Sequence, residues 1–131
     1  MNIGDLDNLK TEHQHQVKLI QLCIEYQKIH PCLALIYAIP NAGKRSKKQG
    51  RWMVSEGLRS GVPDLCLPVP MGKYGALYIE LKRNEKQKKT ELQTAWIETL
   101  RELGNRAEFA YGWKHAMTII LDYLENNGGK A

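Results

Sequence analysis

The stretch GVPDLCLPVPMGKYGALYIELK, from Gly61 to Lys82, decides the fold. It holds two short apolar runs, residues 64–67 and 76–81, on either side of a loop that is rich in Pro and Gly. Runs of this length that are bounded by Gly and Pro are typical of β-strands. Because the loop between them is short, the two strands are expected to pair in the antiparallel sense. The stretch therefore predicts a β-hairpin.

The register of this hairpin gathers charged side chains at one point. A pairing that is symmetric about Gly72 sets Asp64 opposite Glu80, and directly opposed residues have Cβ atoms about 4.5–5.5 Å apart. Because side chains alternate along a strand, Glu80 and Lys82 share one face, whereas Leu81 points toward the core. Two carboxylates this close repel each other unless a cation lies between them, and a hard divalent ion such as Mg²⁺ suits oxygen ligands. The hairpin therefore predicts a metal site.

Such a site fits the cleavage of a phosphodiester. A metal ion held by Asp64 and Glu80, with the backbone carbonyl of Leu81 as a further ligand, lowers the pKa of a bound water and polarises the phosphate. Lys82 lies on the same face, where it can orient that water or stabilise the negative charge that develops. This chemistry predicts a metal-dependent phosphodiesterase.

The whole chain predicts the element order α-β-α-β-β-α-β-α, a mixed sheet flanked by helices. We expect a helix from the N-cap Thr11 to His30, a buried strand over 33–39, a basic helix over 44–58, the two hairpin strands, a helix from the N-cap Thr90 to Leu103, a strand over 106–111 and a helix over 113–126.

Helical spacing of apolar residues predicts which helix positions enter the core. These positions are Val17, Ile20 and Ile24, then Trp52, Met53 and Leu58, then Leu92, Trp96, Leu100 and Leu103, and finally Ala116, Ile120 and Leu124. The last stripe is widened by Ile119 and Tyr123, beyond what one core face needs. Part of this last stripe is therefore expected to form a dimer contact.

Composition indicates one domain over residues 1–131, frayed at about 1–10 and with a tail at about 127–131. The chain is 43% hydrophobic and 25% charged, which argues against disorder. No apolar run approaches the roughly 20 residues of a membrane span, and the first residues lack the pattern of an export signal. The three cysteines have no CxxC spacing, so we expect reduced thiols in a cytoplasmic protein.

The net charge of +5 lies in the middle third of the chain. Residues 41–89 hold 12 basic and 4 acidic side chains, whereas residues 1–40 carry a net charge of −1 and residues 90–131 one of −2. Two basic clusters supply the excess: Lys44, Arg45, Lys47, Lys48 and Arg51 form the first, and Lys82, Arg83, Lys86, Lys88 and Lys89 the second. A positive field of this size predicts a polyanion as the partner.

Taken together, these motifs resemble the virus-type replication-repair nuclease (VRR-Nuc) domain of the PD-(D/E)xK nuclease superfamily. Pro63-Asp64 followed by Glu80-Leu81-Lys82 is similar to the superfamily signature, which is weak on its own. The narrower likeness is an ordered series from about Glu12 to Leu124: Glu12 with Gln16, residues 39–45, residues 56–65, residues 78–82, and Gln93 with Trp96. The family's Asn-Gly-Gly loop reads Asn41-Ala42-Gly43 here, which departs by one glycine.

The resemblance implies a restriction-endonuclease-like core and a DNA endonuclease that depends on Mg²⁺ or Mn²⁺. By this likeness Asp64 and Glu80 are metal ligands, Lys82 is the catalytic lysine, Glu12 is an acidic residue near the metal, and Gln93 approaches the site from the following helix. Small stand-alone members resemble Holliday-junction resolvases. The resemblance therefore also implies a homodimer that acts on branched or flapped DNA, with no membrane and no nucleotide cofactor.

The DNA contacts expected from charge and from the loop are non-specific phosphate contacts. The residues expected to make them are Asn41, Gly43, Lys44, Arg45, Lys47, Lys48, Arg51 and Arg83.

Other interpretations stay open. The chain could be a non-catalytic DNA-binding module, an assembly subunit of a DNA repair or replication complex, or a nuclease that acts on linear ends or on tRNA-like RNA. Glu12 could be only a first-turn acid that the helix dipole favours, and Gln93 only the glutamine of a capping box. A zinc site is not expected, because His13 and His15 do not face each other on a helix.

Overall fold

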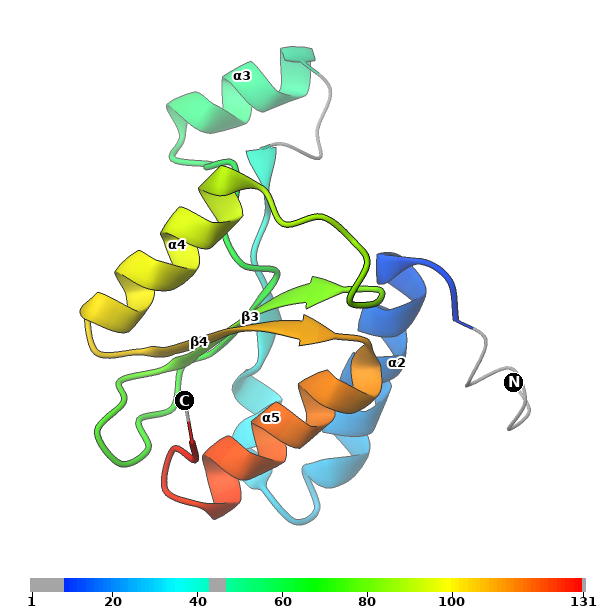
Figure 1. Ribbon diagram of the computed structural model, residues 1–131, viewed down its shortest axis with the longest axis vertical. Helices are drawn as coiled ribbons and strands as arrows, with labels where there is room; N and C mark the ends of the chain where they lie inside the picture. Colours follow the sequence, from blue (N-terminus) through cyan, green and yellow to red (C-terminus); the bar gives the residue numbers. More distant parts are fainter. Residues whose placement is uncertain (1–8, 43–46, 131) are drawn as a thin grey trace.

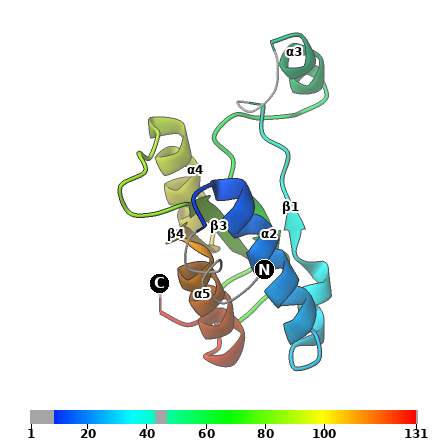
Figure 2. The same cartoon turned by 90° about the vertical axis from the view of Figure 1, so that its right-hand side faces the viewer.

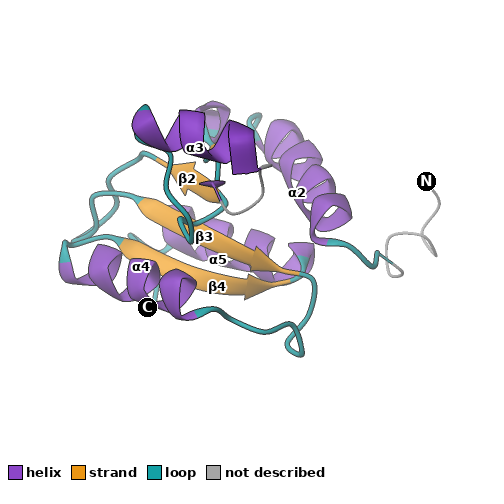
Figure 3. Cartoon of the chain, turned by 90° about the horizontal axis from the view of Figure 1, so that it is seen from above, coloured by secondary structure: helices purple, strands orange, loops and turns teal. Residues whose placement is uncertain are grey.

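The predicted hairpin lies at the centre of a four-stranded sheet in the computed structural model, which describes residues 9–42 and 47–130. The strand order is β1–β2–β3–β4, with bounds Tyr37–Ala38, Leu65–Leu67, Leu77–Lys82 and Arg106–Tyr111. β4 runs parallel to β3, whereas β1, β2 and β3 pair in the antiparallel sense (Figure 3). The mixed sheet flanked by helices that the sequence predicts is confirmed.

The hairpin has the predicted register. Leu65 pairs with Ile79 and Cys66 with Tyr78, and the same register continued by one residue sets position 64 opposite position 80. The parallel partner β4 ends beside the same point, where Lys82 pairs with Tyr111. The charged residues of β3 therefore lie at its carboxyl end, beside the start of β2 and the end of β4.

Helices cover both faces of the sheet. α2 (Glu12–Tyr26) and α5 (Trp113–Glu125) pack on one face, and α4 (Glu91–Glu102) packs on the other (Figures 1 and 2). The larger core lies between the α2–α5 pair and the sheet and includes Leu19, Leu77, Ile79, Leu81 and Ile120. The smaller core lies under α4 and contains Ile97, Leu100 and Ala107. α3 (Lys47–Ser55) stands beyond the end of α4 (Figure 1).

Capping boxes begin α2 and α4, as the sequence predicts. Thr11 Oγ1 accepts a hydrogen bond from the Gln14 amide at 3.1 Å, and Gln14 Oε1 accepts one from the Thr11 amide at 3.1 Å. Thr90 and Gln93 repeat the exchange at 3.1 and 3.0 Å. Each box satisfies backbone N–H groups that have no partner inside the helix. The capping boxes thereby set where both helices begin.

The buried strand predicted over residues 33–39 is wrong. The chain forms a 3₁₀ helix over Pro31–Leu35 and only the two-residue strand β1. Proline at the first helical position has the backbone angle that a helix needs, and of this 3₁₀ helix only Leu33 is buried. The segment therefore becomes a strand only at Tyr37 and Ala38, where it pairs with β2.

Two predicted helix bounds also differ. α2 ends at Tyr26 rather than His30, because residues 27–30 form turns whose amides return to carbonyls of the last helical turn. The basic helix occupies Lys47–Ser55 within the predicted 44–58, and residues 44–46 lie outside the described residues. Its predicted core contact Trp52 is 71% exposed, whereas Met53 and Leu58 are half-buried.

Some helices turn a different face to the core than spacing predicts. α2 buries His15, Leu19 and Cys23, whereas Val17 and Ile24 are 43% and 58% exposed. α4 buries Ile97 and Leu100 and leaves Leu92 and Leu103 exposed. Both helices carry apolar residues on more than one side, so packing selects the buried face. For α2 the partners are α5 and β3, and for α4 the partner is β4.

The last helix has no surplus apolar stripe. Ile119, Ile120, Tyr123 and Leu124 are all buried within the chain itself, so the dimer contact predicted from them is wrong. The predicted tail is also held, because Gly128 is buried and its amide bonds to the Tyr123 carbonyl. Among the described residues, no helix has the length and apolar character that a membrane crossing requires.

Candidate functional site

A tight loop places Asp64 at the start of β2. Gly61 has a φ of +81°, and a Cβ there would lie 2.7 Å from the Leu92 Cβ at the start of α4. Only glycine allows this approach without strain. The Trp96 indole donates to the Ser60 carbonyl at 3.1 Å, so α4 fixes the loop from a second point. These two contacts with α4 therefore fix the path of the loop that leads into β2.

The carboxylate of Asp64 is turned toward β3. Its Oδ2 accepts a hydrogen bond from the backbone amide of Leu81 at 2.7 Å, and the Asp64 carbonyl accepts one from the Ile39 amide at 2.8 Å. The side chain is buried. The residue is thus tied to both neighbouring strands, with its carboxylate beside the residue that follows Glu80.

Three carboxylates converge at this point. Glu12, Asp64 and Glu80 each offer an oxygen, and the three oxygens lie within 4.8 Å of one another. Glu12 is the first residue of α2 and is half-buried, whereas Glu80 is only 1% exposed. The sequence predicted all three, and the fold brings them together from α2, β2 and β3. We call these three residues the acid cluster.

The acid cluster fits a hard divalent cation. Its donors are carboxylate oxygens, which suit ions such as Mg²⁺, Mn²⁺ and Ca²⁺. Like charges this close disfavour one another, and a divalent cation offsets that repulsion. The Leu81 carbonyl as a further ligand stays a prediction.

Lys82 is held in place by neutral oxygens. Its Nζ donates to Gln93 Oε1 at 2.8 Å and to the Lys88 carbonyl at 3.0 Å, and the side chain is buried. Gln93 Oε1 also accepts from the Thr90 amide in the capping box. Gln93 therefore caps α4 and contacts Lys82 at the same time, so the two interpretations of this residue are compatible. The lysine that closes the motif is positioned by α4.

The residues expected to contact DNA lie in different places. Gly43, Lys44 and Arg45 lie outside the described residues, and Lys47 and Lys48 belong to α3. Arg51 is exposed on α3. The Asn41 amide donates to the Val62 carbonyl at 3.3 Å, so this side chain braces the loop before Asp64. Arg83 is exposed directly after β3.

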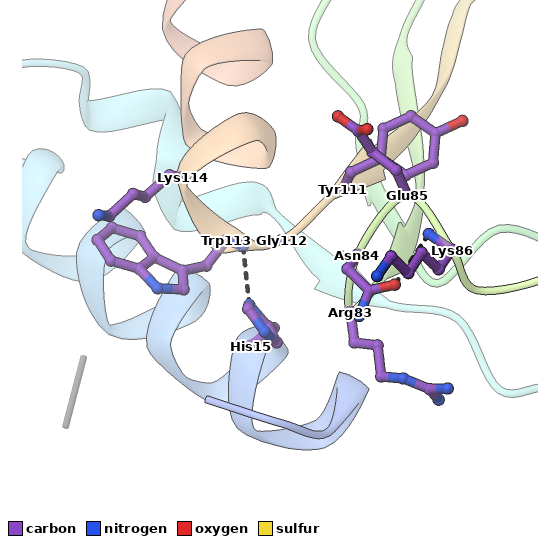
Figure 4. Close-up of a pocket in the computed structure, with 9 residues that line it drawn as sticks. All are labelled: His15, Arg83, Asn84, Glu85, Lys86, Tyr111, Gly112, Trp113 and Lys114. Carbon is purple, nitrogen blue, oxygen red and sulfur yellow. Dashed lines mark hydrogen bonds between the residues drawn. The ribbon is translucent and has the colours of Figure 1, made fainter. Parts of the chain in front are cut away.

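Arg83 borders a cavity of about 530 Å³ on the side of α5. We call it the basic cavity; it is lined by His15, Arg83, Asn84, Glu85, Lys86, Tyr111, Gly112, Trp113 and Lys114. Figure 4 shows Trp113 and Lys114 on one side, Arg83 and Asn84 on the other, and His15 between them. His15 Nδ1 accepts from the Trp113 amide at 3.0 Å, which joins α2 to α5. Three cations at one hollow suit an anionic ligand.

Sequence reasoning missed two lysines that lie against Trp113, of which Lys114 also lines this cavity. Lys18 and Lys114 lie 5.7 and 5.5 Å from the centroid of the Trp113 ring, a cation–π arrangement. Both belong to parts of the chain with a negative net charge, so charge counting did not single them out. The available signal in the sequence was an aromatic residue followed by a lysine, Trp113-Lys114, shortly after the predicted strand over 106–111.

Comparisons with known proteins agree on one family. The model of the VRR-NUC domain matches residues 10–114. A solved structure named VRR_NUC domain protein superposes with a TM-score of 0.77 at 26% sequence identity, over 92% of this chain and 94% of that chain. No curated protein matches the sequence significantly.

Proposed function

The chain belongs to the VRR-NUC domain family, a nuclease-type family, and from this premise we propose that it is a Mg²⁺-dependent endonuclease acting on structured or branched DNA. The observation that carries the proposal is the acid cluster at the end of β3. Two residues beyond Glu80, the ammonium of Lys82 is fixed by its hydrogen bond to Gln93. The sequence Pro63-Asp64 and Glu80-Leu81-Lys82 supports the PD-(D/E)xK type.

The acid cluster would hold the metal. Glu12, Asp64 and Glu80 would supply its protein ligands. The chemistry that a divalent ion would supply there is a lowered pKa for a bound water and polarisation of the scissile phosphate. Mn²⁺ is expected to replace Mg²⁺, because both ions accept oxygen ligands.

Lys82 would act on the reacting phosphate directly. An ammonium has three N–H donors, and two of them point to Gln93 and the Lys88 carbonyl. These two bonds fix the nitrogen, and the third donor is available to the attacking water or to a phosphate oxygen. A fixed donor of this kind stabilises negative charge as it develops and needs no reorganisation during the reaction.

The DNA backbone would lie over the basic surfaces on either side. Arg83, Lys86 and Lys114 at the basic cavity, together with Arg51 on α3, are suited to phosphate contacts that do not read sequence. A homodimer with two active sites would suit a junction that is nicked symmetrically. That part of the proposal rests on the resemblance to junction resolvases.

A cleavage assay on four-way junction, flap, splayed-arm and linear duplex DNA tests the proposal, with Mg²⁺, Mn²⁺ or a chelator. We expect nicking of a branched substrate with either metal and none with the chelator. Asp64→Asn is the control that removes one ligand charge at constant size. Metal-independent binding without cleavage by the wild type would instead support a non-catalytic DNA-binding module.

A further inference from the structure

A groove of about 710 Å³ runs along α2 and opens at the acid cluster. We call it the α2 groove; it is lined by Glu12, His13, Gln16, Val17, Ile20, Gln21, Ala38, Ile39, Pro40, Asn41 and Asp64. Figure 2 shows α2 beside β1, and residues 38–41, at the end of β1 and just after it, form the opposite wall together with Asp64. Glu12 and Asp64 belong both to this groove and to the acid cluster. A DNA strand with one phosphate at the acid cluster would therefore have the adjacent nucleotide at the mouth of the α2 groove.

The lining of the α2 groove differs from that of the basic cavity. Its walls carry apolar side chains, among them Val17 and Ile39, and amide side chains such as Gln16 and Gln21. None of the described residues that line it is a lysine or an arginine. Its charges at the cluster end are carboxylates. Among the described residues that line the groove, a phosphate would therefore meet carboxylates and no lysine or arginine.

The two hollows lie on different sides of α2. Residues of an α-helix are separated by about 100° of rotation, so Gln16 and Ile20 project roughly 100–140° around the helix from His15. Gln16 and Ile20 line the groove, whereas His15 lines the basic cavity. The start of α2, with Glu12, thus lies between a hollow lined by lysine and arginine and one whose described lining residues include neither.

We propose that the α2 groove receives an unpaired nucleoside of the substrate, adjacent to the phosphate at the acid cluster. The proposal rests on the proposed function, because it takes the bound polymer to be DNA. A nucleobase has apolar faces and polar edges, so it matches apolar walls that carry amide groups. A fully base-paired duplex would present its phosphates to the groove instead of a base, and phosphates are bound by cationic side chains. The groove therefore selects DNA in which one base beside the site is unstacked.

A binding experiment on the full chain tests this directly. The probe is a duplex with one unpaired 2-aminopurine, compared with the same duplex in which the 2-aminopurine is paired. Ca²⁺ supplies a cation that accepts oxygen ligands. We expect the wild type to bind the unpaired probe roughly tenfold more tightly, because the apolar walls around Val17, Ile20 and Ile39 remove part of the base face from water. The fluorescence of the unpaired 2-aminopurine should change on binding.

A pair of matched variants locates the effect. Val17→Trp fills the groove, and Ile24→Trp makes the same change on the same side of α2, two helical turns further on, outside the lining residues. Both positions are exposed, so neither change disturbs the core. We expect Val17→Trp to lose the tenfold preference and Ile24→Trp to keep it.

Three outcomes would overturn the proposal: equal affinity of the wild type for both probes, a preference that survives Val17→Trp, or a Val17→Trp protein that loses an oligomeric state while its DNA preference is unchanged. The last outcome would assign the groove to a second copy of the chain. A preference for the unpaired base without any Mg²⁺-dependent cleavage would keep this proposal and remove the nuclease activity. Cleavage without a base preference would do the reverse.

Discussion

The two ends of the parallel pair β3–β4 contain buried charge of two different kinds. At the start of β4, the buried Arg106 donates through Nη1 to Asp122 Oδ2 and to the Gly128 carbonyl, each at 2.9 Å. At the end of β3, Glu80 lies among oxygens of Glu12 and Asp64 that are within 4.8 Å of one another. Opposite charges meet at the first end and like charges at the second.

The two ends differ in the kind of charge that they bring together. The chain supplies the counter-charge of Arg106 itself, and the pair ties the end of α5 to the sheet. Two residues beyond Glu80, the buried Lys82 donates to neutral oxygens of Gln93 and Lys88. Carboxylates gathered this closely are typical of binding and catalytic sites. The cluster agrees with the divalent metal that a nuclease-type family suggests.

The largest expected effect is that of Glu80→Gln, which removes one charge from the acid cluster at constant size. Loss of a metal ligand removes several kcal/mol of transition-state stabilisation, so the cleavage rate should fall by about 10⁴-fold. With metal chelated, the free energy of unfolding should rise by about 1 kcal/mol, because like-charge repulsion is relieved. Single-turnover cleavage and urea unfolding measure the two effects.

Glu98→Gln, an exposed change on α4, is the matched control and should alter neither quantity. A Glu80→Gln protein that cleaves normally would remove Glu80 from the site. A large loss of stability in the chelator would mean that Glu80 is structural, like Arg106, and would erase the contrast between the two ends.

Lys82→Met should have the next largest effect. Removing one preorganised donor lowers the rate by about 10²–10³-fold, whereas Mn²⁺ affinity should be unchanged because no ligand is lost. The helix cap should also survive, since Gln93 still accepts from the Thr90 amide. Single-turnover cleavage and Mn²⁺ titration test this, with Lys88→Met as control, because Lys88 contributes only its carbonyl to Lys82. Reduced Mn²⁺ affinity would mean that Lys82 supports the metal ligands instead.

Arg106→Met sharpens the comparison from the other end of the sheet. The buried Gly128 carbonyl loses its donor, which should lower the free energy of unfolding by about 1–3 kcal/mol. The cleavage rate per folded molecule should not change. Arg101→Met is the control, because this side chain is 47% exposed. It removes an ion pair with Glu108 and a hydrogen bond to the Ala107 carbonyl, which together should contribute about 1 kcal/mol. A slower reaction at full folding would couple the two ends and contradict their separation.

The hairpin and the site motif could be predicted because they depend on local rules. The loop centred on Gly72 and strand alternation set the register of β2 and β3, and threonine caps set the starts of α2 and α4. Asp64 and Glu80 followed from that register, which needs only one hairpin. Glu12 followed from the likeness to a known family alone, because it reaches the site from the distant helix α2.

Features that depend on packing could not be predicted. α2 has Val17 and Ile24 on one side and Leu19 and Cys23 on another, and only contact with α5 and β3 buries the second side. The apolar run after Pro31 fits a strand or a helix equally well by composition. The basic cavity and the α2 groove each join residues from distant elements, so no sequence window contains them.

The smallest expected effect is a pH dependence at Asp122. Hydrogen bonds from Asn126, Arg106 and the Lys130 amide hold the pKa of this carboxyl below its ordinary value. Its contribution is therefore complete above the unfolded pKa of about 4 and is lost as pH falls through the lower folded value. The urea midpoint of the wild type should exceed that of Asp122→Asn by a constant amount at neutral pH, and the difference should shrink under acid. A difference that persists at the most acidic pH would mean that the amide fails for steric reasons, and that the balance of charge at this end of the sheet is not what stabilises it.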